Sequence, residues 1–597
     1  MKGGRSAHAL LASVLWTVLG AGCRGPATPT DPAPAARRYR DVTKHTPASV
    51  RADQFRLDWS NKPALYRSYA GAETVALPAT RILTQPTVDA IAPVPAAATS
   101  AAALDLDLLG TLLFLTGGVT RARPSGGDIR ATAAAGALYP NELYVVTGNL
   151  PALAAGVYHY EPQEQRLSRL RDGDWRSVLA EAADDPDVRR APATVVVTGI
   201  LWRSAWKYRE RAYRHLHWDG GMMVAHLLAA AHAADLPAAV LGAFIDERVD
   251  RLVGADGIHE ATLALVRLGA PGPAVASKAM EIGPLAFAAG RLSRQPIDYP
   301  EALRYHAASK LESAKAVQRI RAARLEEGVP AGALTSVALP APARSEASLD
   351  AVVRRRSSTR RFVQRPITAA ELVTVLALPA RGTPADFLRG QPTLLETYVI
   401  VNAVEGVPTG AYHYRRDAQQ LEIVRQGSFR DTVGFLCLGQ ALAQDASAVL
   451  FYLADLAHIR RAFSERGDRL AELEAGLLAG KAYLAAYAVG RGATGLTFYD
   501  DEVTRFFSPH AEGWAPLLVV AVGVPARRHA GTIPQSLTSR RRLAAARGHR
   551  PIAPRFDPDI GARPGAVAAR APRFAGVGVR DVCCVRGPQR RAPEDAS

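Results

Sequence analysis

The sequence predicts a protein of the α+β class, made of two similar halves arranged in tandem. Two observations support this prediction. Short apolar stretches typical of strands, such as 143–147 and 194–198, alternate with long helical stretches such as 220–234. In addition, segments of the first half return in the second half at a nearly constant spacing. We therefore expect two mixed domains of the same fold.

The internal repeat is the stronger of these signals. Glu142-Leu-Tyr-Val-Val146 is echoed by Glu396-Thr-Tyr-Val-Ile400, and Gly156-Val-Tyr-His-Tyr160 by Gly410-Ala-Tyr-His-Tyr414, in both cases 254 residues later. The spacing changes by no more than one residue over about 130 residues, which indicates a tandem duplication.

The repeat and the local composition divide the chain into five segments. Within the connector between the halves, Tyr299 to Glu327 has the apolar spacing of one amphipathic helix, expected to pack on both halves. The segments are a signal- or lipoprotein-like stretch with its linker (1–36), a first domain (40–275), a helical connector (276–345), a second domain (346–530) and a basic tail (531–597).

Composition excludes several classes of protein. With 597 residues and 48% hydrophobic residues, the chain can bury sizeable cores and is too apolar to be mainly disordered. The four cysteines, Cys23, Cys437, Cys583 and Cys584, offer neither a disulfide framework nor the spaced pairs of a zinc site. Any redox chemistry must therefore come from a bound cofactor.

The formal charge of +17 is concentrated at one end of the chain. Residues 527–597 hold 15 arginines and five acidic residues, a net charge of +10. From about Ile552 this tail is rich in proline, glycine and alanine without apolar periodicity, which predicts disorder. We interpret it as a solvated extension and expect no nucleic-acid partner.

The first residues resemble an export signal. Lys2 and Arg5 precede a mostly apolar run from Ala7 to Gly22, which is short for a transmembrane helix and ends at Cys23. The run resembles the cleavage and lipidation site of a bacterial lipoprotein, so the protein is exported or anchored at Cys23 on this reading. The alternative is a misplaced start codon ahead of a cytoplasmic enzyme.

Two further patterns are read as structural. Gly490-Arg-Gly-Ala-Thr-Gly495 satisfies G-x-G-x-x-G, but it follows a helical stretch and precedes a strand-like one, the reverse of the order that a dinucleotide site needs. Four histidines of the first half form no i, i+4 pair and have no carboxylate cluster beside them, so we expect no metal site among them. They are His215, His217, His226 and His232.

A basic segment opens the second half. Arg354 to Phe362 combines five arginines with three hydroxyl residues, a donor set suited to a phosphate group, although an exposed basic run before a helix has the same composition. Arg356-Ser-Ser358-Thr-Arg360-Arg-Phe362 resembles the R-x-S-x-[RK]-x-F motif with which the nitroreductase superfamily holds the FMN phosphate. The resemblance implies that Arg356, Ser358 and Arg360 contact this phosphate.

The first half carries a second signature. Ala135 to Val146 is similar to the P-S-A-G-A-L-Y-P-x-E-x-Y segment of the SagB/ThcOx-type branch, flavin-dependent dehydrogenases that oxidise azolines in peptide natural products, with Ala133 and Ala134 in place of Pro-Ser. This likeness implies that five residues of the loop border the flavin, and that Gly495, Leu496 and Arg528 (or Arg527) also contact it. The five are Gly136, Ala137, Leu138, Tyr139 and Pro140.

The same branch has a K-Y-x-x-R segment whose Lys-Tyr pair is the catalytic base. Trp206 to Arg214 resembles it, which implies Lys207 and Tyr208 as catalytic residues. The alternative is an ordinary cationic helix end. Both side chains normally titrate near pH 10, so catalysis needs burial or neighbouring cations such as Arg209 and Arg211 to favour their deprotonated forms.

Each half lacks what the other keeps. The first half has no lysine or arginine from Ile82 to Thr120, where the second half has its basic segment. In the second half, Gly390 to Leu394 replaces the Gly136 to Pro140 loop, and Ala462 and Phe463 replace Lys207 and Tyr208. Because superfamily members are homodimers with FMN at the interface, the resemblance implies an intrachain pseudo-dimer with one intact site and one FMN.

The resemblance implies a flavin-dependent oxidoreductase of the SagB/ThcOx type that acts on a small molecule or a modified peptide. An NAD(P)H-dependent nitro- or quinone reductase is the first alternative, and a non-catalytic scaffold with the same fold is the second. A cytoplasmic location follows from the resemblance, and an exported or lipid-anchored one from Cys23.

Overall fold

The computed structural model describes residues 31–91, 102–122, 127–273, 280–325, 334–389 and 391–526. The expectations of a signal segment, a lipidated Cys23, a disordered tail and a flavin contact by Arg528 all lie outside these residues. Within the described part, no helix has both the length and the apolar character needed to cross a bilayer.

The first half is built on a seven-stranded antiparallel sheet in the order β1-β6-β5-β4-β7-β9-β8. Its central strands are buried along their whole length because helices cover both faces. The strands are β1 (Thr74–Ala76), β4 (Asn141–Thr147), β5 (Gly156–Glu161), β6 (Arg166–Asp172), β7 (Ala193–Ile200), β8 (Ala238–Leu241) and β9 (Glu260–Leu268), with a separate ribbon of β2 (Val119–Arg121) and β3 (Ile129–Arg130).

The second half repeats this plan in the order β10-β16-β15-β13-β17-β19, with β18 on β19 in the place of β8. Strand β11 extends the sheet, and β12 and β14 form a small parallel pair. The strands are β10 (Ser336–Ala338), β11 (Phe362–Val363), β12 (Ile367–Thr368), β13 (Glu396–Val401), β14 (Val404–Glu405), β15 (Gly410–Arg415), β16 (Gln420–Gln426), β17 (Ala448–Ala454), β18 (Gly492–Leu496) and β19 (Ala515–Pro525). The predicted α+β class with two similar domains in tandem is confirmed.

The helices recur in the same order in both halves. Those of the first half are α3 (Thr87–Ala90), α4 (Leu106–Gly117), α5 (Arg176–Ala183), α6 (Pro186–Arg190), α7 (Leu201–Tyr208), α8 (Ala212–Ala233) and α9 (Asp246–Val253), with the 3-10 turns η1 (Trp59–Asn61), η2 (Ala135–Ala137) and η3 (Arg209–Arg211). Those of the second are α12 (Leu349–Arg355), α13 (Ala369–Ala380), α14 (Arg430–Leu436), α15 (Ala441–Asp445), α16 (Leu456–Phe463), α17 (Arg466–Ala488) and α18 (Asp500–Phe507).

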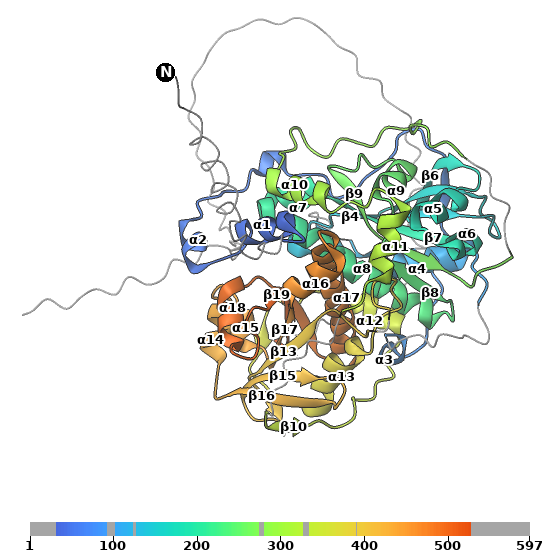
Figure 1. Cartoon of the computed structure of the whole chain (residues 1–597). Coiled ribbons are helices and arrows are strands. Elements are labelled where there is room, and N and C mark those ends of the chain that lie inside the picture. The colour runs from blue at the N-terminus through green and yellow to red at the C-terminus, as the bar shows by residue number, and fades with distance from the viewer. Residues whose placement is uncertain are drawn as a thin grey trace, which may run out of the picture. The chain divides into compact units, whose positions relative to one another are not determined.

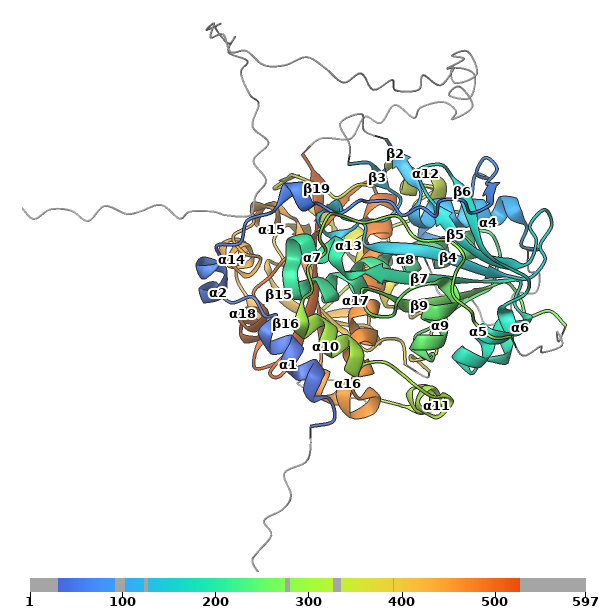
Figure 2. The same cartoon turned by 90° about the horizontal axis from the view of Figure 1, so that it is seen from above.

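The two long helices α8 and α17 pack against each other at the centre of the molecule (Figure 1; Figure 2). Glycines allow the close approach: a Cβ on Gly221 would lie 2.0 Å from the carbonyl oxygen of Leu473, and one on Gly476 would lie 2.1 Å from that of Trp218. Gly221 and Gly476 are 255 positions apart, so the crossing itself obeys the repeat. Both halves contribute to one continuous hydrophobic core.

Buried ion pairs join the halves reciprocally. Arginines that begin α8, or lie just before it, bind Asp500 of the second half, and arginines that begin α17 bind Asp246 of the first. Exchange of equivalent contacts in this way is the mark of a twofold interface, so the halves are paired as two subunits of a dimer would be. The bonds are Arg211–Asp500 (2.8 Å), Arg214–Asp500 (2.7 Å), Arg466–Asp246 (2.8 Å) and Arg469–Asp246 (3.1 Å).

The connector differs from its prediction, because it contains two helices rather than one. α10 (Pro300–Ala308) and α11 (Ala314–Ala322) are separated by a turn in which Leu311 donates its backbone N–H to Asp246, 2.7 Å away. This tertiary bond takes an amide that one continuous helix would use internally, and Ser313 then caps α11. The predicted strand after Gly495 is also displaced, since β18 already begins at Gly492.

The N-terminal helix α1 (Pro34–Val42), which α2 (Pro47–Ala52) follows, belongs to the first half in sequence but contacts the second. Backbone amides of Ala35 and Ala36 donate to the Glu465 carboxylate at 2.9 and 2.7 Å, and α1 also packs on α10 (Figure 2). Helix α1 therefore adds to the contact between the halves.

Candidate functional site

The loop that precedes β4 has a strained backbone. Gly136, Ala137 and Tyr139 all have positive φ angles, of 62°, 54° and 46°. Such angles cost energy in residues other than glycine and persist where surrounding contacts enforce them. Here the backbone N–H of Ala135 lies 3.0 Å from both carboxylate oxygens of Asp219, a buried residue of α8.

The other end of the loop is fixed to α7. The guanidinium of Arg203 donates to the carbonyl oxygen of Tyr139 at 2.9 Å and to the Glu142 carboxylate at 2.6 Å. The Tyr139 hydroxyl in turn accepts the backbone N–H of Arg130. Of the predicted loop residues, Leu138, Tyr139 and Pro140 are buried and only Gly136 is exposed. The loop thus exposes the backbone of Gly136 to solvent and buries the side chains of residues 138–140.

Lys207 and Tyr208 end helix α7 beside this glycine. A Cβ on Gly136 would lie 2.9 Å from the Tyr208 hydroxyl and 3.3 Å from Cδ of Lys207. Both side chains are half-buried. The Tyr208 ring stacks on His215 with centroids 4.0 Å apart. The structure therefore brings the predicted catalytic pair into contact with the predicted flavin loop.

His215 gives Tyr208 an uncharged neighbour. Burial, together with the nearby Arg211, lowers the pKa of His215 well below its usual range, so its ring is neutral at pH 7. Neither of its ring nitrogens has a hydrogen-bond partner among the described residues. His217 and His226 are also buried, and each directs Nδ1 at a backbone carbonyl oxygen within its core.

The basic segment after α12 reaches across to the first half. Arg356 is buried, and its Nε and Nη2 lie 2.8 and 2.7 Å from the carbonyl oxygens of Ala131 and Arg130, just before the strained loop. Arg121 returns the contact by donating to the carbonyl oxygen of Arg356 at 3.0 Å. Arg360 is exposed. The segment from 356 to 360 therefore has one arginine that joins the halves and one that faces solvent.

The same segment lies along β18 of its own half. The backbone N–H of Thr359 donates to the carbonyl oxygen of Ala493 at 2.9 Å. The hydroxyl of Tyr483 on α17 bonds to the Ser358 side chain and accepts the backbone N–H of Gly495. Gly495 is exposed and Leu496 is buried. Ser358 and Gly495 thus lie on either side of the Tyr483 hydroxyl, whereas Leu496 belongs to the hydrophobic core.

The corresponding place in the other half is filled by the chain itself. Val240 of β8 pairs with β9 as Gly495 of β18 pairs with β19, but Val240 also forms a bridge with Ala385. The Val240 N–H donates to Pro384 at 2.7 Å, and Asp386 accepts the N–H of Gly242 at 2.7 Å. Arg321 of α11 donates to the same carboxylate at 3.0 Å.

The edges of β18 and β8 are equivalent by the repeat, but they differ in what surrounds them and in the chemical groups they offer. One offers an exposed glycine edge, an exposed arginine, a hydroxyl and a glycine loop, which together suit an anionic ligand with a planar ring. At the other, residues 384–387 cover the strand edge, and Phe387 would clash with any Cβ on Gly242 at 2.7 Å.

The model of the nitroreductase family matches residues 100–270 and again 353–524, which together make up more than half of the chain. The chain belongs to the nitroreductase family. Each half carries its own match, in agreement with the two equivalent sheets.

This nitroreductase-family chain is similar in sequence to a curated protein and in fold to a solved structure. A protein of Methanocaldococcus jannaschii named as a candidate nitroreductase is 28% identical over 184 residues, which cover 30% of the chain and 91% of that protein. A crystal structure of a candidate nitroreductase from Anabaena variabilis superposes with a TM-score of 0.65 at 26% identity, covering 82% of the chain and 99% of the other. Both halves together therefore occur in another known structure.

Two groups of residues escaped the sequence analysis of this family member. Asp219 and Glu474 occupy equivalent positions on α8 and α17, and each accepts a backbone N–H from the loop before β4 or β13. Because the two acidic residues are 255 positions apart, the spacing of the repeat could have identified them as an equivalent pair. Asp386 and Arg321 carried no comparable signal, because Asp386 lies in a loop whose sequence does not repeat that of the first half, and Arg321 lies in the connector between the halves.

Proposed function

We propose that this chain is an FMN-dependent oxidoreductase of the SagB/ThcOx type, with a single flavin site shared by its two halves. The observation that carries the proposal is the contact of Arg356 with residues 130 and 131. Through this contact, residues 356–360 of the second half lie next to residues 135–140 of the first, which supports a site shared by the two segments. The family match supports an oxidoreductase.

The residues present fit FMN. Arg360 is exposed and offers a fork of N–H donors to a phosphate, and Ser358 adds a hydroxyl. Gly136 and Gly495 present backbone without side chains, so a planar ring could approach closely. Arg356 has a different part, because two of its nitrogens are held by carbonyl oxygens; it positions the segment and leaves Nη1 for the ligand.

When bound, FMN supplies a ring that accepts a hydride from the substrate. The chain must then take up the accompanying proton, and Tyr208 and Lys207 are the groups placed for this beside Gly136. The neutral, buried His215 under the Tyr208 ring keeps water from that face of the ring. A substrate C–H that faces Gly136 would therefore meet both a proton acceptor and the flavin edge.

We further propose that the substrate is an azoline, in a small molecule or a modified peptide, oxidised to the azole. The second candidate is a nitro- or quinone reductase that draws hydride from NAD(P)H, and the family match is the observation that favours it. Rapid bleaching of the bound flavin by NAD(P)H would establish the second candidate and exclude the first.

Flavin content tests the site itself. The full chain, purified and saturated with FMN, is expected to retain one FMN per chain, measured by absorbance after denaturation. A ratio near two would contradict the closure of the second site by residues 384–387. Colourless protein that takes up no FMN would contradict flavin binding altogether and leave a scaffold role.

A further inference from the structure

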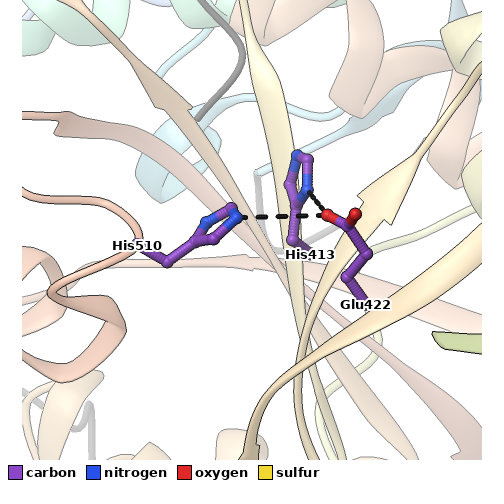
Figure 3. A group of neighbouring side chains, drawn as sticks. All are labelled: His413, Glu422 and His510. Carbon is purple, nitrogen blue, oxygen red and sulfur yellow. Dashed lines mark hydrogen bonds and ion pairs between the residues drawn. The ribbon is translucent and has the colours of Figure 1, made fainter. Parts of the chain in front are cut away.

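Three side chains gather on one face of the second sheet. Their strands, β15 and β16, are separated from β18 and β19 by β13 and β17. His413 lies on β15 and Glu422 on β16, and His510, which follows α18, points its ring towards them from one side (Figure 3). Nδ1 of His413 is 2.8 Å from Oε2 of Glu422, and Nε2 of His510 is 4.0 Å from the same oxygen. All three atoms lie within 4.8 Å of one another.

The group is buried and one of its members is unsatisfied. The side chains of His413, Glu422 and His510 are 1%, 7% and 8% exposed. Nε2 of His510 has no hydrogen-bond partner among the described residues, although it points at the Glu422 carboxylate (Figure 3). A buried polar nitrogen without a partner costs free energy unless something binds it.

Each of the three side chains forms a hydrogen bond with a further residue outside the group. Nε2 of His413 lies 3.1 Å from the Glu396 carboxylate, and Nδ1 of His510 lies 2.9 Å from the Tyr398 hydroxyl. The second oxygen of Glu422 accepts from Arg415 at 2.9 Å. Outer partners of this kind orient the ligands of metal sites and set which imidazole nitrogen is left for the ion.

The repeat provides an internal comparison. The first half keeps the Glu–His pair, with Nε2 of His159 3.1 Å from Glu142, so that pair belongs to the shared fold. Ser168 pairs with His159 as Glu422 pairs with His413, and Tyr69 contacts Tyr144 where His510 contacts Tyr398. The carboxylate and the second imidazole are therefore additions found only in the second half.

We propose that His413, Glu422 and His510 bind a divalent transition-metal ion, for which Zn²⁺ is the probe. Two imidazole nitrogens and one carboxylate oxygen are a ligand set that Zn²⁺ accepts, with water in the fourth position. Binding displaces the proton shared by His413 and Glu422 and widens their contact. The ion would tie the segment after α18 to β15 and β16, a structural role separate from the flavin.

The test compares the full chain with three variants after removal of metal by chelation and dialysis. His510→Gln and Glu422→Gln remove a ligand, and His159→Gln alters the matched histidine of the first half. We expect the unaltered chain and His159→Gln to bind one more Zn²⁺ per chain than the two ligand variants. Tail groups such as Cys583 and Cys584 are common to all four proteins and cancel.

Two further readouts protect the test against misfolding. Zn²⁺ should raise the unfolding temperature of the unaltered chain and leave that of His510→Gln unchanged, and Co²⁺ should give visible absorption bands only where the site is intact. In chelator, the unaltered chain and His510→Gln should unfold at similar temperatures. Equal Zn²⁺ binding by the unaltered chain and His510→Gln would overturn the proposal, as would loss of the extra ion in His159→Gln.

Discussion

Nε of Arg356 donates a hydrogen bond to the carbonyl oxygen of Ala131, 2.8 Å away and 225 positions earlier in the chain. The bond fixes the start of the proposed phosphate-binding segment of one half against the residues that lead into the glycine loop of the other. A site built in this way depends on the pairing of the halves as much as on the residues that face the ligand.

The two arginines of the segment should therefore respond differently to mutation. Arg360→Ala should weaken FMN binding about tenfold or more and leave the unfolding temperature unchanged, because it removes an exposed charged donor. Arg361→Ala, an equally exposed neighbour, is the control and should bind FMN normally. Equal affinity of the Arg360→Ala variant and the unaltered chain would remove Arg360 from the site.

Arg356→Ala should lower both FMN occupancy and stability. It strands two buried carbonyl oxygens, each worth about 1–3 kcal/mol. Denaturant unfolding and flavin titration on the same protein separate the two effects. Undiminished flavin occupancy in the Arg356→Ala plus Arg360→Ala double variant would contradict the site.

Gly136→Ala should abolish turnover, whereas Gly173→Ala should not. Both glycines have positive φ angles, of 62° and 90°, so both substitutions carry the backbone cost of a left-handed L residue, about 1–2 kcal/mol. Only at Gly136 does the new Cβ meet a neighbour, the Tyr208 hydroxyl at 2.9 Å, since nothing lies within 4 Å at Gly173. The measurement is turnover at equal flavin saturation, and equal losses in the two variants would refute the role of the contact.

Tyr208→Phe should lose about 10²- to 10⁴-fold in turnover, with FMN binding unchanged, if the hydroxyl takes up the substrate proton. The backbone tolerates the substitution, because Phe463 ends the equivalent helix α16 with the same unusual cap: φ is 50° at Arg209 and 52° at Ser464. Lys207→Ala tests the second member of the pair in the same assay. Retained turnover in both variants would exclude them as the base.

Asp500→Asn should destabilise the chain by about 3–5 kcal/mol, because it leaves buried arginines without a counter-charge. Burial alone would raise the pKa of Asp500, but Arg211 and Arg214 outweigh it and hold the pKa well below its usual range. Asp246→Asn should have a similar effect on the other side of the interface. Glu502→Gln, which breaks the exposed pair with Arg505, is the control and should leave the unfolding midpoint almost unchanged.

Asp219 should make stability depend on pH in the neutral range. Burial raises its pKa from near 4 to about 8, so the folded chain keeps a proton that the unfolded chain has released. Its contribution is therefore complete below about pH 4 and is lost as the pH rises towards 8, by up to about 1.4 kcal/mol per pH unit. The free energy of unfolding, measured by denaturant titration at several pH values, should fall over this range in the unaltered chain more steeply than in Asp219→Asn. The same pH dependence in both proteins would contradict the prediction.

Much of the fold could be predicted from local pattern. The repeat at 254–255 residues implied two equivalent domains, and strands such as β4 and β7 alternate with long helices as expected. The single helix expected in the connector was wrong, because the bond from Leu311 to Asp246 depends on a residue 65 positions away. Local periodicity cannot register a contact of that kind.

Part of the candidate site was predictable too. Arg356, Ser358, Gly136 and Tyr208 were found by their motifs, but the sequence treats the arginines alike, and only burial distinguishes Arg356 from Arg360. The closure of the second place by Asp386 and the gathering of His413, Glu422 and His510 were not predictable. Their members come from separate elements, and no fixed spacing links them.

By itself, the sequence determined the class of fold, its duplication and the residue types available for an anionic cofactor, since these follow from short-range periodicity and composition. Only the tertiary structure decided how the second of the two equivalent places is closed and which arginine joins the halves. The physical reason is that those outcomes depend on contacts between the halves, such as Arg356 with Ala131 and Gly242 with Asp386, in which residues far apart in the sequence satisfy each other's buried polar groups.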